Sequence, residues 1–223
     1  MTALLAESEL LAQLLRSPRL PTIAVQVKAL LADEAQRRAH FVDTVLETEK
    51  AEFVNGAKFV HPPAKFKYIA VVGNLYDLVK AFVLAHDLGW VGSEKVMVSL
   101  TRNDYEPDIC YFAAAKADAF QPDQNRFPAP DFIVEVLSAS TEANDRGVKF
   151  DDYAAHGVAE YWLIDPDTQT VEQYRLHTDV YELAIKAQSG ELHSFAVPGF
   201  TIPVRAIFDD ATNQATLRHL LAA

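Results

Sequence analysis

The sequence predicts a single globular α/β protein in which helices flank a mixed β-sheet, preceded by an N-terminal helical extension. Residues 1–50 carry apolar positions at helical spacing and contain few turn residues. Short apolar runs separated by turn residues follow through residues 51–204, with helical stretches between some of them. Because several of these strands are consecutive and hairpin-like, we expect an α/β sandwich and not a doubly wound fold.

Composition limits the class of protein. The chain has 223 residues, of which 50% are hydrophobic and 23% charged, and this is enough for one soluble domain with a sizeable core. One cysteine excludes an intrachain disulfide and suits a reducing cytosol, so we expect a cytoplasmic protein. The start, MTALLAESEL, lacks a basic n-region, and no apolar run approaches the ~20 residues that span a bilayer, so we expect no membrane partner. The net charge of −11 has the wrong sign for a general polyanion binder.

The N-terminal third is predicted to be two helices, a hairpin and a third helix. Apolar periodicity favours helices over residues 8–15 and 22–49, separated by the breaker SPRLP. Asn55-Gly56 lies between two short apolar runs, and this pair tolerates the positive φ of a tight hairpin turn. A helix is expected over 65–88, with Gly89 in the position of a helix stop.

The remaining elements are mostly strands. A short helix is expected near 114–119, and a polar turn leads into a helix that Gly157 ends. Strands are predicted at 94–100, 106–114, 131–137, 159–165, 170–176, 180–187 and 196–204. We place the domain boundaries at 1–50 for the helical extension, 51–210 for the main domain and 211–223 for a tail that can be helical.

The strand in APDFIVEVLSAS, residues 129–140, contains a carboxylate in an apolar context. Side chains alternate between faces with period 2, so Ile133, Glu135 and Leu137 share one face. Burying an unpaired carboxylate costs several kcal/mol or forces its protonation, so Glu135 needs a compensating group. The plainer alternative is that Glu135 reaches solvent.

Asp108, in EPDICYFAA, resembles Glu135 in that it leads into an apolar strand. If the two strands pair, both carboxylates converge on one point, and their repulsion raises a pKa or calls for a cation. Hard oxygen ligands suit Mg²⁺ or Mn²⁺. For Asp108, which follows Pro107 at a strand start, simple exposure to solvent is the alternative.

Other site types are absent from the sequence. It contains no Gly-rich phosphate loop and no nucleophile-elbow serine. The seven histidines are too far apart to form a helical zinc pair, and Cys110 alone cannot build a thiolate site. These residues are better explained as surface, capping or core positions.

Three segments together resemble the Uma-two family of endonucleases, within the PD-(D/E)XK, restriction-endonuclease-like superfamily. They are PDI at 107–109, APDFIVEVLSAST at 129–141 and DRGVKFDDYAAHGVAEYWLIDP at 145–166. The resemblance runs from about residue 52 to 209 and implies a restriction-endonuclease-like core with flanking helices in the main domain. It also implies metal-dependent phosphodiester hydrolysis.

The resemblance assigns roles to four residues. Asp108 matches the first metal-binding aspartate, and Glu135 matches the acidic residue of the next strand. The superfamily lysine two residues later is replaced by Leu137, and Lys149 on the following helix is the matching lysine. Glu52 resembles the early glutamate of the family. Without the resemblance, Lys149 reads as a helix-surface lysine paired with Asp145 or Asp152, on a stripe shared with Tyr153 and His156.

The chain departs from the family pattern at three further positions. Ala57 stands where a second acid is common, Tyr68 where a histidine often opens the helix, and Ala139 where the turn usually has proline. The first two bear on the outer part of the site. The third is a loop variation.

The expected function is therefore a Mg²⁺- or Mn²⁺-dependent endonuclease acting on DNA as a homodimer, with Asp108 and Glu135 as metal ligands. The acidic net charge requires a local basic strip, for which Lys95, Arg102, Arg126 and Arg146 are candidates. Two alternatives stay open. One is a catalytically degenerate binding or assembly module, and the other is a hydrolase of a small phosphate ester.

Overall fold

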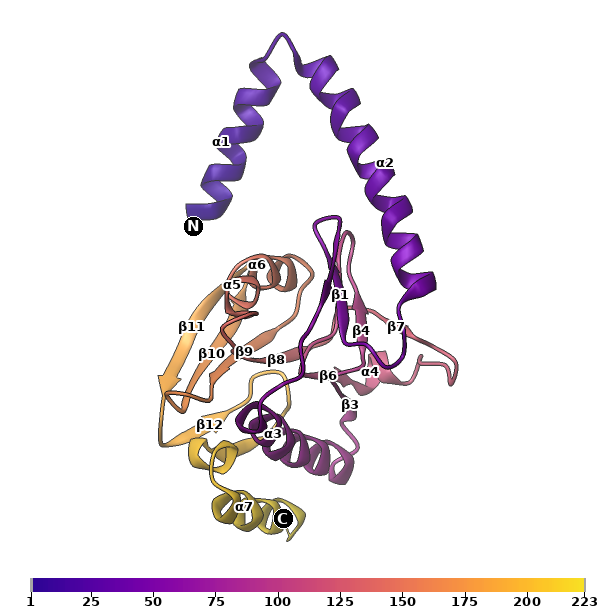
Figure 1. The fold of residues 1–223 in the computed structure, drawn as a ribbon. Coiled ribbons are helices and arrows are strands. Elements are labelled where there is room, and N and C mark those ends of the chain that lie inside the picture. The colour runs from indigo at the N-terminus through magenta and orange to yellow at the C-terminus, as the bar shows by residue number, and fades with distance from the viewer. Residues whose placement is uncertain (1, 223) are drawn as a thin grey trace. The chain divides into compact units, whose positions relative to one another are not determined.

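The computed structural model describes residues 2–222 and divides into two compact units, Met1–Val60 and His61–Ala223 (Figure 1). Each unit is described by itself. The domain boundaries inferred from the sequence stay a prediction.

The N-terminal unit consists of two helices and a hairpin. These are α1 (Thr2–Arg16), α2 (Leu20–Thr44), β1 (Ala51–Val54) and β2 (Ala57–Val60). The predicted break at SPRLP lies between the helices, and Pro21 stands in the first turn of α2, where a missing N–H costs no hydrogen bond. Asn55 (φ 49°) and Gly56 (φ 84°) form the predicted two-residue turn.

A six-stranded mixed sheet forms the centre of the C-terminal unit, as the sequence predicts. Its order is β11-β10-β9-β8-β6-β3, and only the β8–β9 pair is parallel within it. The strands are β3 (Gly89–Ser93), β6 (Ile109–Ala113), β8 (Phe132–Val136), β9 (Glu160–Asp165), β10 (Thr170–His177) and β11 (Val180–Ala187).

One face of this sheet carries the hydrophobic core. Phe132, Val134 and Val136 of β8 pack there with Trp162 of β9, as the period-2 alternation predicts. Fully burying such side chains stabilises the fold by about 1.5–3 kcal/mol each. The covering elements are α3 (Phe66–Ala85), β12 (Glu191–His193), β13 (Thr201–Pro203), η1 (Val204–Ile207) and α7 (Asp210–Ala222).

Helix α3 corrects the expectation that no segment is apolar enough to span a bilayer. Its 20 residues are long and apolar enough to cross a membrane, by length and composition only. In the structure, however, Leu75, Leu78 and Val79 are buried in the core cluster. This face packs α3 into the core, whereas Ile69 and Leu84 on the same helix are 55% and 63% exposed.

The end of α3 also differs from the prediction, because Gly89 does not stop the helix. The helix ends at Ala85, and Asp87 takes the left-handed conformation (φ 59°) while the Leu88 N–H donates to the Val83 carbonyl. Gly89 begins β3 instead. A Cβ atom there would lie 2.2 Å from the Phe112 carbonyl oxygen, so glycine is required by close backbone approach.

The opposite face of the sheet carries two short helices, one on each side of residues 146–147 (Figure 1). They are α5 (Glu142–Asp145) and α6 (Val148–Ala155), and Gly157 (φ 75°) follows α6 as predicted. A smaller set of strands, with β4 joined to β5 and β7, belongs to the same unit. Its elements, with the remaining helix, are β4 (Met97–Ser99), β5 (Asp104–Tyr105), α4 (Ala114–Ala117) and β7 (Arg126–Phe127).

Candidate active site

Pairing of β6 with β8 brings Asp108 and Glu135 to one face of the sheet. The ladder ends where Ile109 pairs with Val134, and Asp108 directly precedes Ile109 while Glu135 directly follows Val134, so continuing this register by one residue would set Asp108 opposite Glu135. Residues directly opposite each other have Cβ atoms about 4.5–5.5 Å apart. The Val136 N–H donates to Asp108 Oδ2 at 2.7 Å, which anchors this carboxylate where the ladder ends.

Lys149 of α6 reaches Glu135 across this face. Its Nζ lies 3.0 Å from Glu135 Oε1, and the two side chains are 2% and 4% exposed. The Tyr153 hydroxyl donates to the same oxygen at 3.1 Å. Glu135 is therefore compensated within the protein by a buried lysine and a tyrosine. Removing one member of such a buried pair costs about 3–5 kcal/mol.

Asp145 joins this cluster, although no functional role is expected for it from the sequence. Its Oδ1 lies 3.1 Å from Lys149 Nζ, and its side chain is 1% exposed. Burial raises the pKa of Asp145, Lys149 opposes that shift, and the nearby Asp108 charge adds to it. The available signal was the i,i+4 spacing to Lys149, which we read as a surface pair.

The other predicted partner of Lys149, Asp152, instead anchors α6 to the β4–β5 connection. It accepts hydrogen bonds from Asn103 Nδ2 at 2.7 Å and from the Tyr105 hydroxyl at 2.8 Å. Lys149 Nζ lies 5.8 Å from the centre of the Tyr105 ring. These contacts fix the face of α6 that carries Lys149.

Glu52 lies in β1 and is 1% exposed. It belongs to the N-terminal unit, whereas Asp108, Glu135 and Lys149 belong to the C-terminal unit. The cluster described above is formed by the C-terminal unit, and the role of Glu52 stays a prediction.

Three residues of the predicted basic strip pair with carboxylates. Lys95 pairs with Glu106 at 2.7 Å, and Arg126 approaches Asp104 at 3.5 Å. Arg146 pairs with Glu172 at 2.7 Å. Because these pairs neutralise the cations locally, the positive charge expected from the sequence is reduced.

The carboxylates fit a Mg²⁺ site of one kind. Within residues 2–222, no group of three or more His, Cys, Asp or Glu residues is arranged as a metal cage. Mg²⁺ commonly uses one or two protein carboxylates and completes its shell with water and substrate phosphate. Asp108 and Glu135 are two carboxylates of this type, and their binding of Mg²⁺ stays a prediction.

Comparison with known proteins decides the family. Residues 39–205 match the Uma2 family model, described as "Putative restriction endonuclease". The chain belongs to this family. The resemblance inferred from the three sequence segments is thereby confirmed, and with it the membership of a family of restriction-endonuclease type.

A solved structure supports the fold. The chain is similar to the crystal structure of a putative nuclease belonging to DUF820 from Anabaena variabilis, with a TM-score of 0.66 and 20% sequence identity. The match covers 79% of this chain and 96% of that one, so the two chains share their fold over most of their length. Among curated proteins, no match was found.

Proposed function

We propose that the protein is a Mg²⁺- or Mn²⁺-dependent endonuclease that hydrolyses phosphodiester bonds of DNA. The observation that carries the proposal is the convergence of Asp108, Glu135 and Lys149 on one face of the sheet in a chain of the Uma2 family. Two acids from paired strands and one lysine from α6 suit this reaction because phosphate chemistry depends on positioning and electrostatic stabilisation.

Each residue has a distinct role in this proposal. Asp108 and Glu135 would hold the metal ion, which supplies a Lewis acid and a water of lowered pKa when bound. Lys149 would orient the attacking water or offset negative charge on the phosphate, because Glu135 and Asp145 hold its ammonium group in place. Glu52 is the further acid that the family resemblance suggests.

The proposal includes a homodimer, since two sites related by a twofold axis can cut both strands of a duplex. The N-terminal helical extension offers a surface for contact between two copies of the chain. Val27, Leu30 and Leu31 lie on one stripe of α2 and are 50%, 54% and 47% exposed. Light scattering at tens of micromolar protein tests the dimer, and the 24.7 kDa mass of one chain would refute it.

The decisive experiment is a cleavage assay on supercoiled and linear DNA and on RNA, with Mg²⁺, Mn²⁺ or EDTA. We expect metal-dependent DNA cleavage that Asp108→Asn, Glu135→Gln and Lys149→Met abolish. Glu182→Gln, on an exposed position of β11, is the matched control and should cleave like the wild type.

The alternatives give different results in the same series. Metal-dependent hydrolysis of bis-p-nitrophenyl phosphate without nucleic acid cleavage would replace the nuclease with a small-ester hydrolase. Inactivity on every substrate, with a correctly folded wild type, would leave a binding or assembly module.

A further inference from the structure

Two residues of the cluster around Glu135 lie where α5 meets α6. Asp145 ends α5, and Lys149 lies in the first turn of α6. The helices have 4 and 8 residues, and isolated helices this short are not stable in water. Tertiary contacts must therefore hold this corner, residues 145–149, and with it the lysine.

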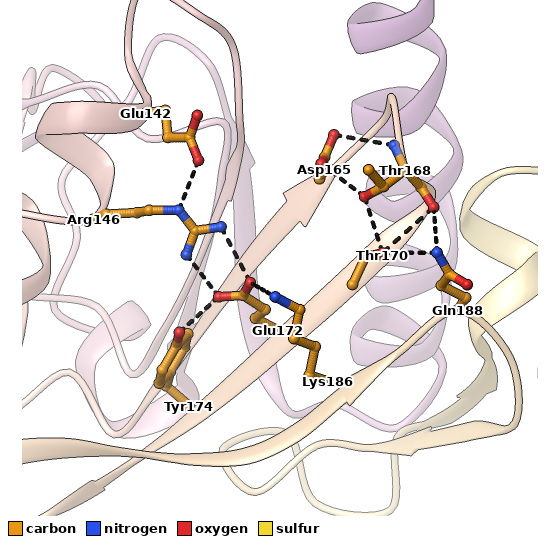
Figure 2. Close-up of polar contacts among 9 residues, drawn as sticks. All are labelled: Glu142, Arg146, Asp165, Thr168, Thr170, Glu172, Tyr174, Lys186 and Gln188. Carbon is orange, nitrogen blue, oxygen red and sulfur yellow. Dashed lines mark hydrogen bonds and ion pairs between the residues drawn. The ribbon is translucent and has the colours of Figure 1, made fainter.

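Arg146 supplies the most extensive of these contacts (Figure 2). Its Nη1 and Nη2 donate to the two oxygens of Glu172 at 2.7 and 3.1 Å, in a bidentate pair. Its Nε donates to Glu142 Oε1 at 2.9 Å. A bidentate guanidinium–carboxylate pair fixes orientation as well as distance, so the corner is tied to one place on β10.

Glu172 is itself held from three sides. Besides its pair with Arg146, Glu172 accepts a hydrogen bond from the Tyr174 hydroxyl at 2.7 Å. Lys186 Nζ of β11 lies 2.9 Å from Glu172 Oε1 (Figure 2). Its side chain is 7% exposed. Burial acts to raise its pKa, but hydrogen bonds from Arg146, Tyr174 and Lys186 outweigh it and lower the pKa to about 2. Glu172 is thus a negatively charged side chain of β10 that contacts from β10 and β11 hold in place.

The corner has two more constraints that agree with this anchor. The buried Tyr161 hydroxyl donates to the Asp145 carbonyl at 3.0 Å. A Cβ atom at Gly147 would lie 2.7 Å from the Ala143 carbonyl oxygen, so the chain passes too close there for a side chain. The side chains diverge from this point: Arg146 points to β10, whereas Asp145 and Lys149 meet each other.

We propose that Arg146 and Glu172 are positioning residues that hold Lys149 against Glu135. The catalytic consequence rests on the function proposed above, but the positioning itself does not. When the ion pair between Arg146 and Glu172 is lost, the corner opens locally and Lys149 moves from Glu135 into solvent. The core on the other face of the sheet stays folded.

The test measures the reactivity of Lys149 directly. Native protein is labelled with an amine-reactive reagent, and the rate at each lysine is followed by mass spectrometry. In the wild type, Lys149 should label far more slowly than Lys186, whose side chain is 60% exposed. In Arg146→Gln and Glu172→Gln, we expect the Lys149 rate to rise about tenfold or more, because local opening controls protection.

Three comparisons make the result specific. The double variant should label like either single variant, since both changes break one pair. Arg205→Gln, a matched change on an exposed arginine of η1, should leave Lys149 protected. Glu160→Gln lowers global stability at another place in the fold, and Lys149 should stay protected in it under conditions where the protein is folded.

Unchanged labelling in a folded Arg146→Gln protein would overturn the proposal, as would an equal rise in Glu160→Gln. Where the wild type cleaves DNA, Arg146→Gln should lower kcat per folded molecule and leave KM unchanged, with the folded fraction measured by circular dichroism. A merely structural role would leave kcat per folded molecule at the wild-type value. If the wild type cleaves nothing, the proposed function fails, and the labelling experiment still decides the positioning.

Discussion

Glu160 is a buried carboxylate whose replacement by glutamine gives a sharp test of the energetics in this fold. It is 0% exposed and accepts five hydrogen bonds. Oε1 accepts from Trp162 at 2.6 Å and Gln173 at 2.7 Å. Oε2 accepts from the Ser194 hydroxyl at 2.6 Å and from the N–H groups of Phe195 and Ala196 at 2.8 Å each.

Glutamine has the same shape but must place an NH₂ group at one of the two oxygen positions. In the better orientation the NH₂ group faces the two donors at Oε1, so two hydrogen bonds become donor–donor contacts. Hydrogen bonds to a charged group contribute about 1.5–3 kcal/mol each. The loss of two, with weakening of the other three, predicts about 3–5 kcal/mol out of a typical 5–15 kcal/mol.

Urea unfolding followed by circular dichroism measures this loss, and an unchanged m-value confirms that the transition is comparable. Glu182→Gln, exposed on β11, is the control and should be neutral to within about 0.5 kcal/mol. A loss of less than about 1 kcal/mol in Glu160→Gln would refute the reasoning, because it would mean that the charge of Glu160 contributes little to these five contacts.

Three further predictions concern the site and its anchor. Lys149→Met should lower the free energy of unfolding by about 3–5 kcal/mol at pH 7; a neutral effect in urea unfolding would contradict the buried pair. Millimolar Mn²⁺ should raise Tm by binding the folded state, and Asp108→Asn should blunt the rise; a flat wild-type response would argue against a metal site. The folded pKa of Glu172, about 2, lies below its ordinary 4.5, so its contribution is complete above pH 4.5 and is lost as the pH falls toward 2. After solvent screening, the ionised Glu172 side chain contributes about 1–2 kcal/mol to the free energy of unfolding. Acid unfolding curves of Glu172→Gln should lack this pH-dependent loss of stability.

The affinity of the protein for DNA should depend weakly on salt concentration if Lys95, Arg126 and Arg146 stay paired with their carboxylates. Each phosphate contact adds to the salt dependence of binding through counterion release. The residues that we first expected to form a basic strip are largely committed to pairs within the same unit. Nucleic acid binding must then draw on other cations or on the metal.

The sequence alone determined the features that depend on local periodicity and turn chemistry. Alternation in β8 placed Glu135 on the face opposite Phe132, Val134 and Val136, and the structure agrees. Asn55-Gly56 specified a hairpin because few residues adopt positive φ easily. Strands β5 and β7 were missed because two residues carry no periodic signal.

Only the tertiary structure decided which groups compensate the buried charges. Glu135 and Lys149 are 14 residues apart, and Glu160 and Ala196 are 36 apart, so the chain topology and not the local pattern sets these pairs. Glu160 sits in a strand whose sequence gives no sign of its five donors. Arg146 and Lys149 share one short segment, yet the bend at Gly147 sends one side chain to Glu172 and the other to Glu135. A one-dimensional pattern fixes the face of a residue, but the partner on that face depends on how distant segments pack.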